Sequence, residues 1–244
     1  MNVLLLAGTG EARRLAGKLA EMSNVTATAS LAGVTQRPME LAIPTRHGGF
    51  GGDDRFRNFL ILNDIGAVID ATHPFAAHVT NRTAKICAKA NLPYVYVLRP
   101  EWRPQPGDDW HYFDQEKEVA SLVKPGQTVF MATGPNGLYH YRDLQDCHVI
   151  CRRIDPPLTP FPFEGGEYLL GRPPFSEQDE IETFRRVNVD WLVTKNSGGD
   201  ASRSKLDAAR ALGIKVALMN RPAPPDATIV ETEVGAIDWL KALL

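Results

Sequence analysis

The chain has 244 residues, of which 43% are hydrophobic and 23% are charged, and its formal net charge is −2. This composition is that of an ordinary globular protein without the basic excess of nucleic-acid-binding domains. No apolar run approaches the roughly 20 residues of a membrane-spanning helix, and the run 3–7 is too short for a signal peptide. The three cysteines favour a reducing compartment. We therefore expect a cytoplasmic protein with no nucleic-acid or membrane partner, and a monomer is compatible with the sequence.

Strand and helix patterns alternate along the first half of the chain. Short apolar or β-branched runs predict strands at 2–7, 25–30, 41–45, 67–70 and 94–98. Helical spacing of apolar residues predicts helices at 11–22, at 53–63 with Asp53 as N-cap, and at 75–90. This rhythm of strand, helix and strand predicts an α/β fold with a doubly wound parallel sheet.

The second half shows a similar rhythm with more interruptions. Residues 99–107 contain three prolines and a glycine and form the predicted linker. Beyond it, strands are predicted at 128–131, 148–152, 191–194 and 215–219. Helices are predicted at 176–187 with Ser176 as N-cap, at 201–212 and at 234–243. We therefore predict two domains, 1–104 and 105–244.

Cys147, His148 and Cys151 lie close enough in sequence to suggest a metal site. They fall in a predicted strand, where successive side chains point to opposite faces of the sheet. His148 would then point away from both cysteines, so we predict no metal site.

The first candidate site is the turn Gly8-Thr9-Gly10-Glu11, between a predicted strand and a predicted helix. Glycines there allow a pyrophosphate to approach the backbone, and the N-terminus of a helix favours negative charge. Arg13 replaces the third glycine of the dinucleotide fingerprint G-x-G-x-x-G. The turn therefore favours nucleotide binding, with a plain glycine turn as the alternative.

The segment after the second predicted strand indicates which nucleotide is bound. NAD sites usually present Asp or Glu there, whereas NADP sites offer a cation and hydroxyl groups. No acidic residue occurs between Ser30 and Glu40, while Ser30, Thr35 and Arg37 supply hydroxyls and a positive charge. The sequence favours NADP, with Arg37 as a ligand of the 2′-phosphate or, alternatively, as an ordinary surface charge.

A third motif, Asp70-Ala71-Thr72-His73-Pro74, ends a predicted strand at the edge where α/β sheets bind ligands. The proline holds His73 in an extended conformation. His73 is therefore a candidate to donate a proton or a hydrogen bond beside a nicotinamide. The alternative is a loop histidine without a direct chemical role.

In the second half, Lys195-Asn196-Ser197-Gly198-Gly199 lies between a strand and a helix, and its amine, amide and hydroxyl suit a carboxylate or phosphate. It is not a Walker A loop, because the lysine precedes the glycines. Arg99 and Arg221 each follow a strand and precede a proline, and their planar guanidinium groups suit carboxylates. A strand-to-helix turn and surface ion pairs are the structural alternatives.

Seven segments in this order resemble the precorrin-6A reductase (cobalt-precorrin-6A reductase) family of cobalamin biosynthesis. They are 4–13, 30–33, 48–52, 70–76, 99–102, 194–199 and 220–222, and the likeness is weakest at 105–175. The resemblance implies two Rossmann-like doubly wound parallel-sheet domains with an interdomain cleft. It also implies an oxidoreductase that uses NADPH to reduce a double bond of the macrocycle precorrin-6A, giving precorrin-6B.

The resemblance further implies roles for particular residues. NADPH would be held by Gly8, Thr9, Gly10 and the segment Ser30-Leu31-Ala32-Gly33, while Thr72, His73 and the loop 194–199 would face the cleft. Arg99, Lys195 and Arg221 would then be candidate partners for the carboxylates of the tetrapyrrole substrate.

Three other functions remain open. A short-chain reductase or epimerase needs a Tyr-x-x-x-Lys pair, but Asp143 and Gln145 follow Tyr139 and Tyr141 at that spacing. A non-catalytic nucleotide-sensing module would not need the second set of motifs at 194–199 and 220–222. A methyltransferase also holds its cofactor on a glycine-rich turn, and the identity of the nucleotide that binds would distinguish it.

Overall fold

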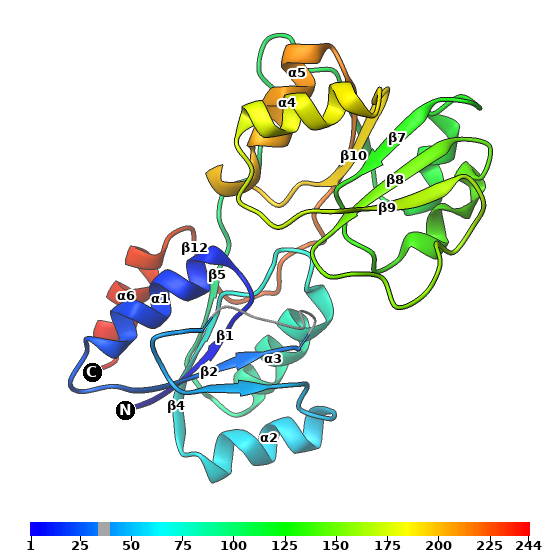
Figure 1. The fold of residues 1–244 in the computed structure, drawn as a ribbon. Coiled ribbons are helices and arrows are strands. Elements are labelled where there is room, and N and C mark those ends of the chain that lie inside the picture. Colours follow the sequence, from blue (N-terminus) through cyan, green and yellow to red (C-terminus); the bar gives the residue numbers. More distant parts are fainter. Residues whose placement is uncertain (34–39) are drawn as a thin grey trace. The chain divides into compact units, whose positions relative to one another are not determined.

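The computed structural model describes residues 1–33 and 40–244, which form two units with their own cores (Figure 1). The first unit comprises Met1–Pro100 and Pro222–Leu244, and the second comprises Glu101–Arg221. The division therefore differs from the predicted domains 1–104 and 105–244. The last strand pairs with the first sheet and the last helix packs against the first helix, so the C-terminal segment belongs to the first unit.

In the first unit, all strands of the sheet run parallel. The strands are β1 (Asn2–Leu6), β2 (Thr26–Leu31), β3 (Thr45–His47), β4 (Ile65–Asp70), β5 (Tyr94–Val97) and β12 (Thr228–Val230). The helices are α1 (Gly10–Ala20), α2 (Asp53–Leu62), α3 (Ala77–Lys89) and α6 (Glu233–Lys241). Hydrogen bonds join the strands in the order β12-β5-β4-β1-β2-β3.

The second unit repeats this plan. Its strands are β6 (Trp110–Phe113), β7 (Thr128–Met131), β8 (His148–Arg153), β9 (Gly166–Leu170), β10 (Trp191–Lys195) and β11 (Lys215–Met219). Its helices are α4 (Glu177–Arg186), α5 (Ser204–Leu212) and the 3-10 helices η1 (Glu116–Ser121), η2 (Leu138–Leu144) and η3 (Asp200–Ser202). The parallel order is β6-β11-β10-β7-β8-β9.

Both sheets have the strand order of a doubly wound Rossmann-like fold, which confirms the predicted fold class. The edge strands are exchanged between the two sheets. β6 follows β5 in the chain but pairs with β11, whereas β12 follows β11 but pairs with β5. The cleft between the domains stays a prediction.

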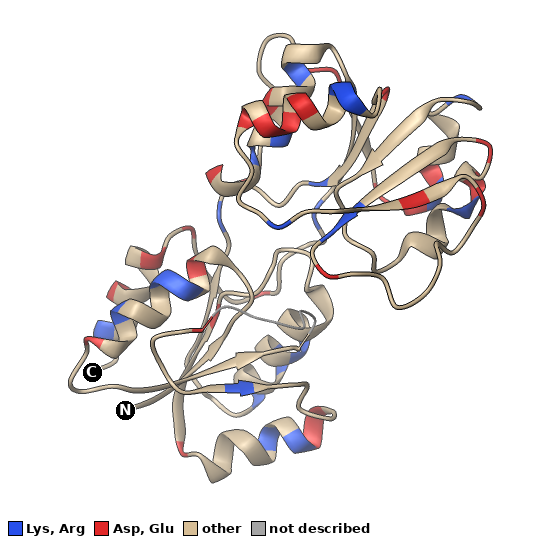
Figure 2. Ribbon diagram, viewed as in Figure 1, with Lys and Arg blue, Asp and Glu red and all other residues tan. Residues whose placement is uncertain are grey.

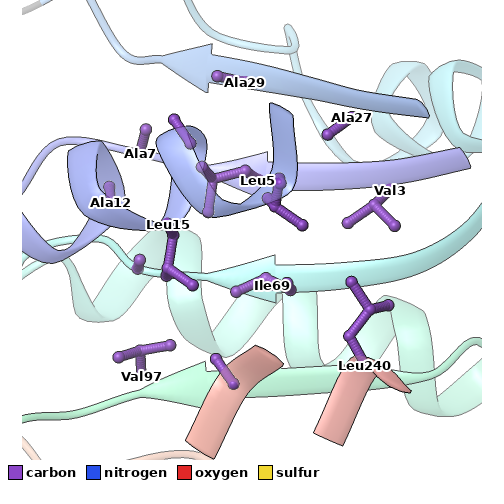
Figure 3. Packing of buried hydrophobic residues seen from close by; sticks show 14 of the residues in the cluster. Val3, Leu5, Ala7, Ala12, Leu15, Ala27, Ala29, Ile69, Val97 and Leu240 are labelled. Atoms are coloured by element: carbon purple, nitrogen blue, oxygen red, sulfur yellow. The ribbon is translucent and has the colours of Figure 1, made fainter. Parts of the chain in front are cut away.

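Strand β1 shows why apolar runs without alternation form these sheets. Val3 and Leu5 enter the core beneath α1 and α6, while Leu4 enters the core on the α2 and α3 side. Figure 3 shows the first core, where the β1 side chains lie with Leu15 of α1 and Leu240 of α6. Strands of a parallel sheet are covered on both faces, so both sets of side chains are apolar.

The sequence missed three strands, and all three lie at sheet edges: β6, β9 and β12. β6 and β12 are only four and three residues long, and β9 begins with Gly166 and Glu167, so none of the three forms an apolar run long enough to recognise. The strand expected at 41–45 lies at Thr45–His47. Asp53 is the first residue of α2 rather than its N-cap, which is Gly52 at a φ of 109°.

Charged residues lie mainly on helices and loops, while most of the length of the central strands is uncharged (Figure 2). Among residues 1–33 and 40–244, no helix has the length and apolar character needed to cross a bilayer. The same residues include no cluster of three or more His, Cys, Asp or Glu side chains placed to hold a metal ion. Cys147 and Cys151 are buried, and His148 is paired with Glu167 at 3.2 Å.

Candidate functional site

Each sheet has one point where the chain changes its direction of winding. It lies between β1 and β4 in the first unit and between β7 and β10 in the second. Doubly wound proteins bind ligands beyond the carboxyl ends of these strands. The predicted turn Gly8-Thr9-Gly10, the pair Thr72-His73 and the loop after Lys195 all follow these strands. The structure thus gathers the predicted motifs at one such edge in each unit.

The turn Gly8-Thr9-Gly10 leads from β1 into α1. Gly8 has a φ of 149°, which residues with side chains rarely adopt, and among the described residues only its chain neighbours lie within 4 Å of a Cβ built on it. Thr9 is the N-cap: its Oγ1 accepts from the Ala12 N–H at 3.2 Å and donates to the Ala71 carbonyl at 2.7 Å. The first N–H groups of a helix lack carbonyl partners within it. The turn therefore has the open space and the donors that a pyrophosphate requires.

Charged side chains beside this turn are paired with one another. Glu11 accepts from Arg99 at 2.9 Å and lies 3.6 Å from Arg14, which also contacts Glu233. These pairs offset the negative charge of Glu11, which would otherwise repel an anion at the start of α1. Arg99 is thus engaged with the glycine turn, and its expected contact with substrate stays a prediction.

A buried carboxylate holds the segment after β4. Asp70 is fully buried and accepts from the Thr72 N–H at 3.0 Å, the Thr72 hydroxyl at 2.7 Å and the Tyr94 hydroxyl at 2.9 Å. Burial raises the pKa of Asp70, and the hydrogen bonds from Thr72 oppose that rise. Thr72 also lies 3.1 Å from the Thr80 hydroxyl. This network fixes the loop that carries His73.

His73 is half-buried, and its Nδ1 accepts from the Phe75 N–H at 3.2 Å. A ring nitrogen that accepts carries no proton, so the proton of neutral His73 lies on Nε2. α3 begins at Ala77, two residues after the predicted start at 75; before it, the Phe75 N–H is bonded to the histidine ring and the Ala76 N–H to the His73 carbonyl in a tight turn.

Arg46 lies beside the end of β2 and was not predicted as a site residue. It donates to the hydroxyl of the buried Ser30 at 2.7 Å. Arg46 lies in β3 directly opposite Ser30, whereas the strand expected at 41–45 excluded it. Its place before the Gly48–Gly52 run was the available signal. Thr35 and Arg37, expected at this tip, lie outside the described residues.

The Leu31-Ala32-Gly33 segment continues this tip toward the glycine-rich loop. The Leu31 carbonyl accepts from the Gly48 N–H at 2.9 Å, and Gly33 has a φ of 79°. A Cβ on Gly33 would lie 3.7 Å from the Gly48 nitrogen. The loop that follows β3 is therefore folded against the tip of β2.

In the second unit, several predicted substrate ligands hold the segment that enters the unit. The Asn196 amide accepts from the Trp102 N–H at 2.9 Å, and the Gly199 carbonyl accepts from the Trp102 indole at 2.6 Å. Arg221 donates to the Asn196 carbonyl at 2.7 Å and lies 3.8 Å from Glu101. Asn196, Gly199 and Arg221 therefore have a structural task, and their contact with substrate stays a prediction.

Lys195 ends β10, and the buried Ser197 follows it, with its hydroxyl 3.3 Å from the Lys195 carbonyl. Burial lowers the pKa of Lys195, and the nearby charge of Glu116 opposes that fall. Gly198 has a φ of 64°, which suits a sharp turn. The loop 133–137 follows the neighbouring strand β7 and was not expected at the site, because only the sheet order places β7 beside β10.

Two Rossmann-like sheets, with a glycine turn at the switch point of the first, define a two-domain α/β protein of the kind that hosts many nucleotide-dependent enzymes. The model of the family described as precorrin-6x reductase CbiJ/CobK matches residues 2–241. The chain therefore belongs to this family, whose members are oxidoreductases of cobalamin biosynthesis acting on a carbon–carbon double bond.

Individual relatives agree with this assignment. A protein of Rhodococcus erythropolis named precorrin-6A reductase is 42% identical over 99% of this chain and 98% of its own length. A protein of Methanothermobacter thermautotrophicus named cobalt-precorrin-6A reductase is 30% identical over 91% of this chain and 77% of its own. A solved structure of CobK precorrin-6A reductase superposes with a TM-score of 0.93, at 34% identity, over 99% of this chain and 96% of that one. The predicted family and fold are confirmed.

Proposed function

We propose that this chain reduces precorrin-6A to precorrin-6B with NADPH, and that the nucleotide binds at the Gly8-Thr9-Gly10 turn of the first unit. The observation that carries the proposal is the open turn between β1 and α1, with N–H donors at the switch point of the sheet. It occurs in a chain that belongs to a reductase family.

The residues at the turn fit a dinucleotide. Bound NADPH supplies the hydride for the reduction, so the protein mainly has to position and polarise the reactants. The open space at Gly8 admits a diphosphate close to the backbone, where a side chain would block it. Thr9 ties the turn to the end of β4, so the segment that carries His73 is held at the same edge.

The proposal favours NADPH over NADH because of the end of β2. The described part of this tip, residues 30–33, carries no carboxylate to accept a hydrogen bond from a ribose 2′-hydroxyl. Instead, the buried Ser30 hydroxyl is bonded to an arginine. A negative group in place of the 2′-hydroxyl suits this tip better than the hydroxyl itself.

For the tetrapyrrole carboxylates, we propose the edge of the second unit at Lys195, Ser197 and Gly198. An amine, a hydroxyl and backbone N–H groups there suit anionic groups. For Arg99 and Arg221 we propose an indirect role, in which each orients neighbouring segments of the site instead of contacting the substrate. Each of them makes an ion pair within its own unit.

His73 is proposed to donate a hydrogen bond from Nε2 to the reacting groups. His73→Ala should lower kcat/KM about 2- to 10-fold, the effect of losing one neutral hydrogen bond worth about 0.5–1.5 kcal/mol. Steady-state kinetics with precorrin-6A measure this effect. His78→Ala is the matched control, because His78 is exposed on α3, and it should retain wild-type kinetics. Unchanged kinetics for His73→Ala would remove this residue from the site.

Titration of the purified protein with NADPH, NADH and S-adenosylmethionine tests the cofactor assignment. We expect NADPH to bind at least about 10-fold more tightly than NADH, because a charge-assisted hydrogen bond to the 2′-phosphate is worth about 1.5–3 kcal/mol. Tight binding of S-adenosylmethionine alone would reject the proposal in favour of a methyltransferase.

A further inference from the structure

We infer that Arg46 and Ser30 form a binding site for a phosphate monoester, and that this site reads the 2′-phosphate of NADPH. The inference rests on the proposed use of NADPH. Arg46 of β3 would then bind the 2′-phosphate for which the sequence suggested Arg37, and Arg46 and Ser30 would be the groups that discriminate between NADPH and NADH.

The position of Arg46 is the first observation. Arg46 pairs with Ser30 in the register of β2 and β3, and Ser30 is the penultimate residue of β2. In Rossmann-like sheets, the residues at the end of this strand contact the adenosine ribose. The Ser30 hydroxyl accepts from Arg46 Nη1 at 2.7 Å, so a cation and a hydroxyl lie together at that end.

The charge of Arg46 is the second observation. Among the described residues, its hydrogen-bond acceptors are all neutral: the Ser30 hydroxyl, the Gly48 carbonyl at 2.9 Å and the Gly49 carbonyl at 3.1 Å. Within residues 1–33 and 40–244, no carboxylate forms an ion pair with this half-buried guanidinium. Other arginines beside the candidate site, Arg99 and Arg221, both have acidic partners. A partly desolvated charge without a counter-ion is costly unless a ligand supplies one.

The third observation is that the guanidinium is already held in place. Its carbon lies 4.0 Å from the centre of the Phe50 ring, and Phe50 packs edge-on against Phe56 at 4.6 Å. The bonds to the Gly48 and Gly49 carbonyls fix the loop around it. A ligand that binds a pre-oriented arginine loses less conformational entropy on binding than one that must order it. Burial also lowers the pKa of Arg46, which an anion would offset.

Binding of 2′,5′-ADP and of 5′-AMP to the whole protein, measured by calorimetry, tests this site without the reaction. The two probes share the adenosine and a single 5′-phosphate, and only 2′,5′-ADP has the 2′-phosphate. We expect the wild type to prefer 2′,5′-ADP, and Arg46→Gln to reduce that preference about 10- to 100-fold while 5′-AMP affinity changes little. Arg46→Lys keeps the charge and should retain part of the preference, and it remains informative if the glutamine variant fails to fold.

Two control variants separate the site from general effects. Arg57→Gln removes an exposed arginine of α2 that pairs with Asp54, and the preference should stay at the wild-type value. Arg37→Gln should also leave it unchanged. A loss of preference in Arg37→Gln with none in Arg46→Gln would overturn the inference and restore the role expected from the sequence.

The remaining outcomes are distinguishable. If Arg46→Gln keeps the preference for 2′,5′-ADP, the inference fails while the use of NADPH stands. An equal loss of affinity for both probes in Arg46→Gln and Arg46→Lys means that Arg46 only supports the glycine-rich loop, which also overturns the inference. If the wild type binds both probes equally, the proposed preference for NADPH fails, and the inference fails with it.

Discussion

Gly8→Ala is expected to raise the Kd for NADPH about 100-fold, which corresponds to about 2.7 kcal/mol of binding free energy. A methyl group on Gly8 would occupy the open space at the start of α1, where the diphosphate must approach the backbone. The φ of 149° also strains any residue with a Cβ, so the free energy of unfolding should fall by about 1–3 kcal/mol. Fluorescence titration and chemical denaturation measure the two effects.

Gly17→Ala is the control for this substitution. Gly17 lies in the same helix, has room for a methyl group and does not have a left-handed φ. It should stabilise the protein by about 0.5–1 kcal/mol and leave the Kd unchanged, because alanine favours a helix interior over glycine. Wild-type affinity for NADPH in Gly8→Ala would contradict placement of the nucleotide at this turn.

Glu180→Ala should give the largest loss of stability, about 3–5 kcal/mol, because it leaves the largely buried Arg152 guanidinium, whose side chain is 12% exposed, without its partner. Glu180 is only 2% exposed, and its two carboxylate oxygens accept from Arg152 at 2.6 and 2.7 Å. Phe175 lies 4.1 Å from the same guanidinium, so little water reaches it. Chemical denaturation measures this loss.

Glu182→Ala is the control for this loss, because Glu182 is exposed on the same helix and bonds only to Gln178 among the described residues. Its effect should stay within about 0.5 kcal/mol. Comparable losses for Glu180→Ala and Glu182→Ala would show that the buried pair contributes no more than a surface residue.

Most of the fold could be predicted from local sequence patterns, because the buried strands of a parallel sheet appear as short apolar runs between helices. Strands β7 and β11 have the predicted limits, and Ser176 caps α4 as expected, with its hydroxyl accepting from the Asp179 N–H at 3.1 Å. The exchange of β6 and β12 could not be predicted in the same way. Both are short edge strands, and the residues of a strand do not indicate which of two sheets the strand pairs with.

The candidate site was also predicted in part. The turn at Gly8 and the segment at His73 could be predicted because each directly follows a predicted strand, and the order of strands along the chain places the two strands at one switch point. The partners of Arg99 and Asn196 were not visible, because Glu11 and Trp102 lie 88 and 94 positions away along the chain. Arg46 escaped notice because its importance depends on register with Ser30, and the limits of β3 were misplaced.

Turnover of NADPH and precorrin-6A together tests whether this chain catalyses the proposed reduction. With purified protein, the absorbance of reduced nicotinamide should fall only when precorrin-6A is present, with equimolar consumption of the two. The product should have gained a hydride and a proton, and NADH should support a slower reaction. A constant absorbance in the presence of both compounds would contradict the proposed reaction and favour a nucleotide-sensing module.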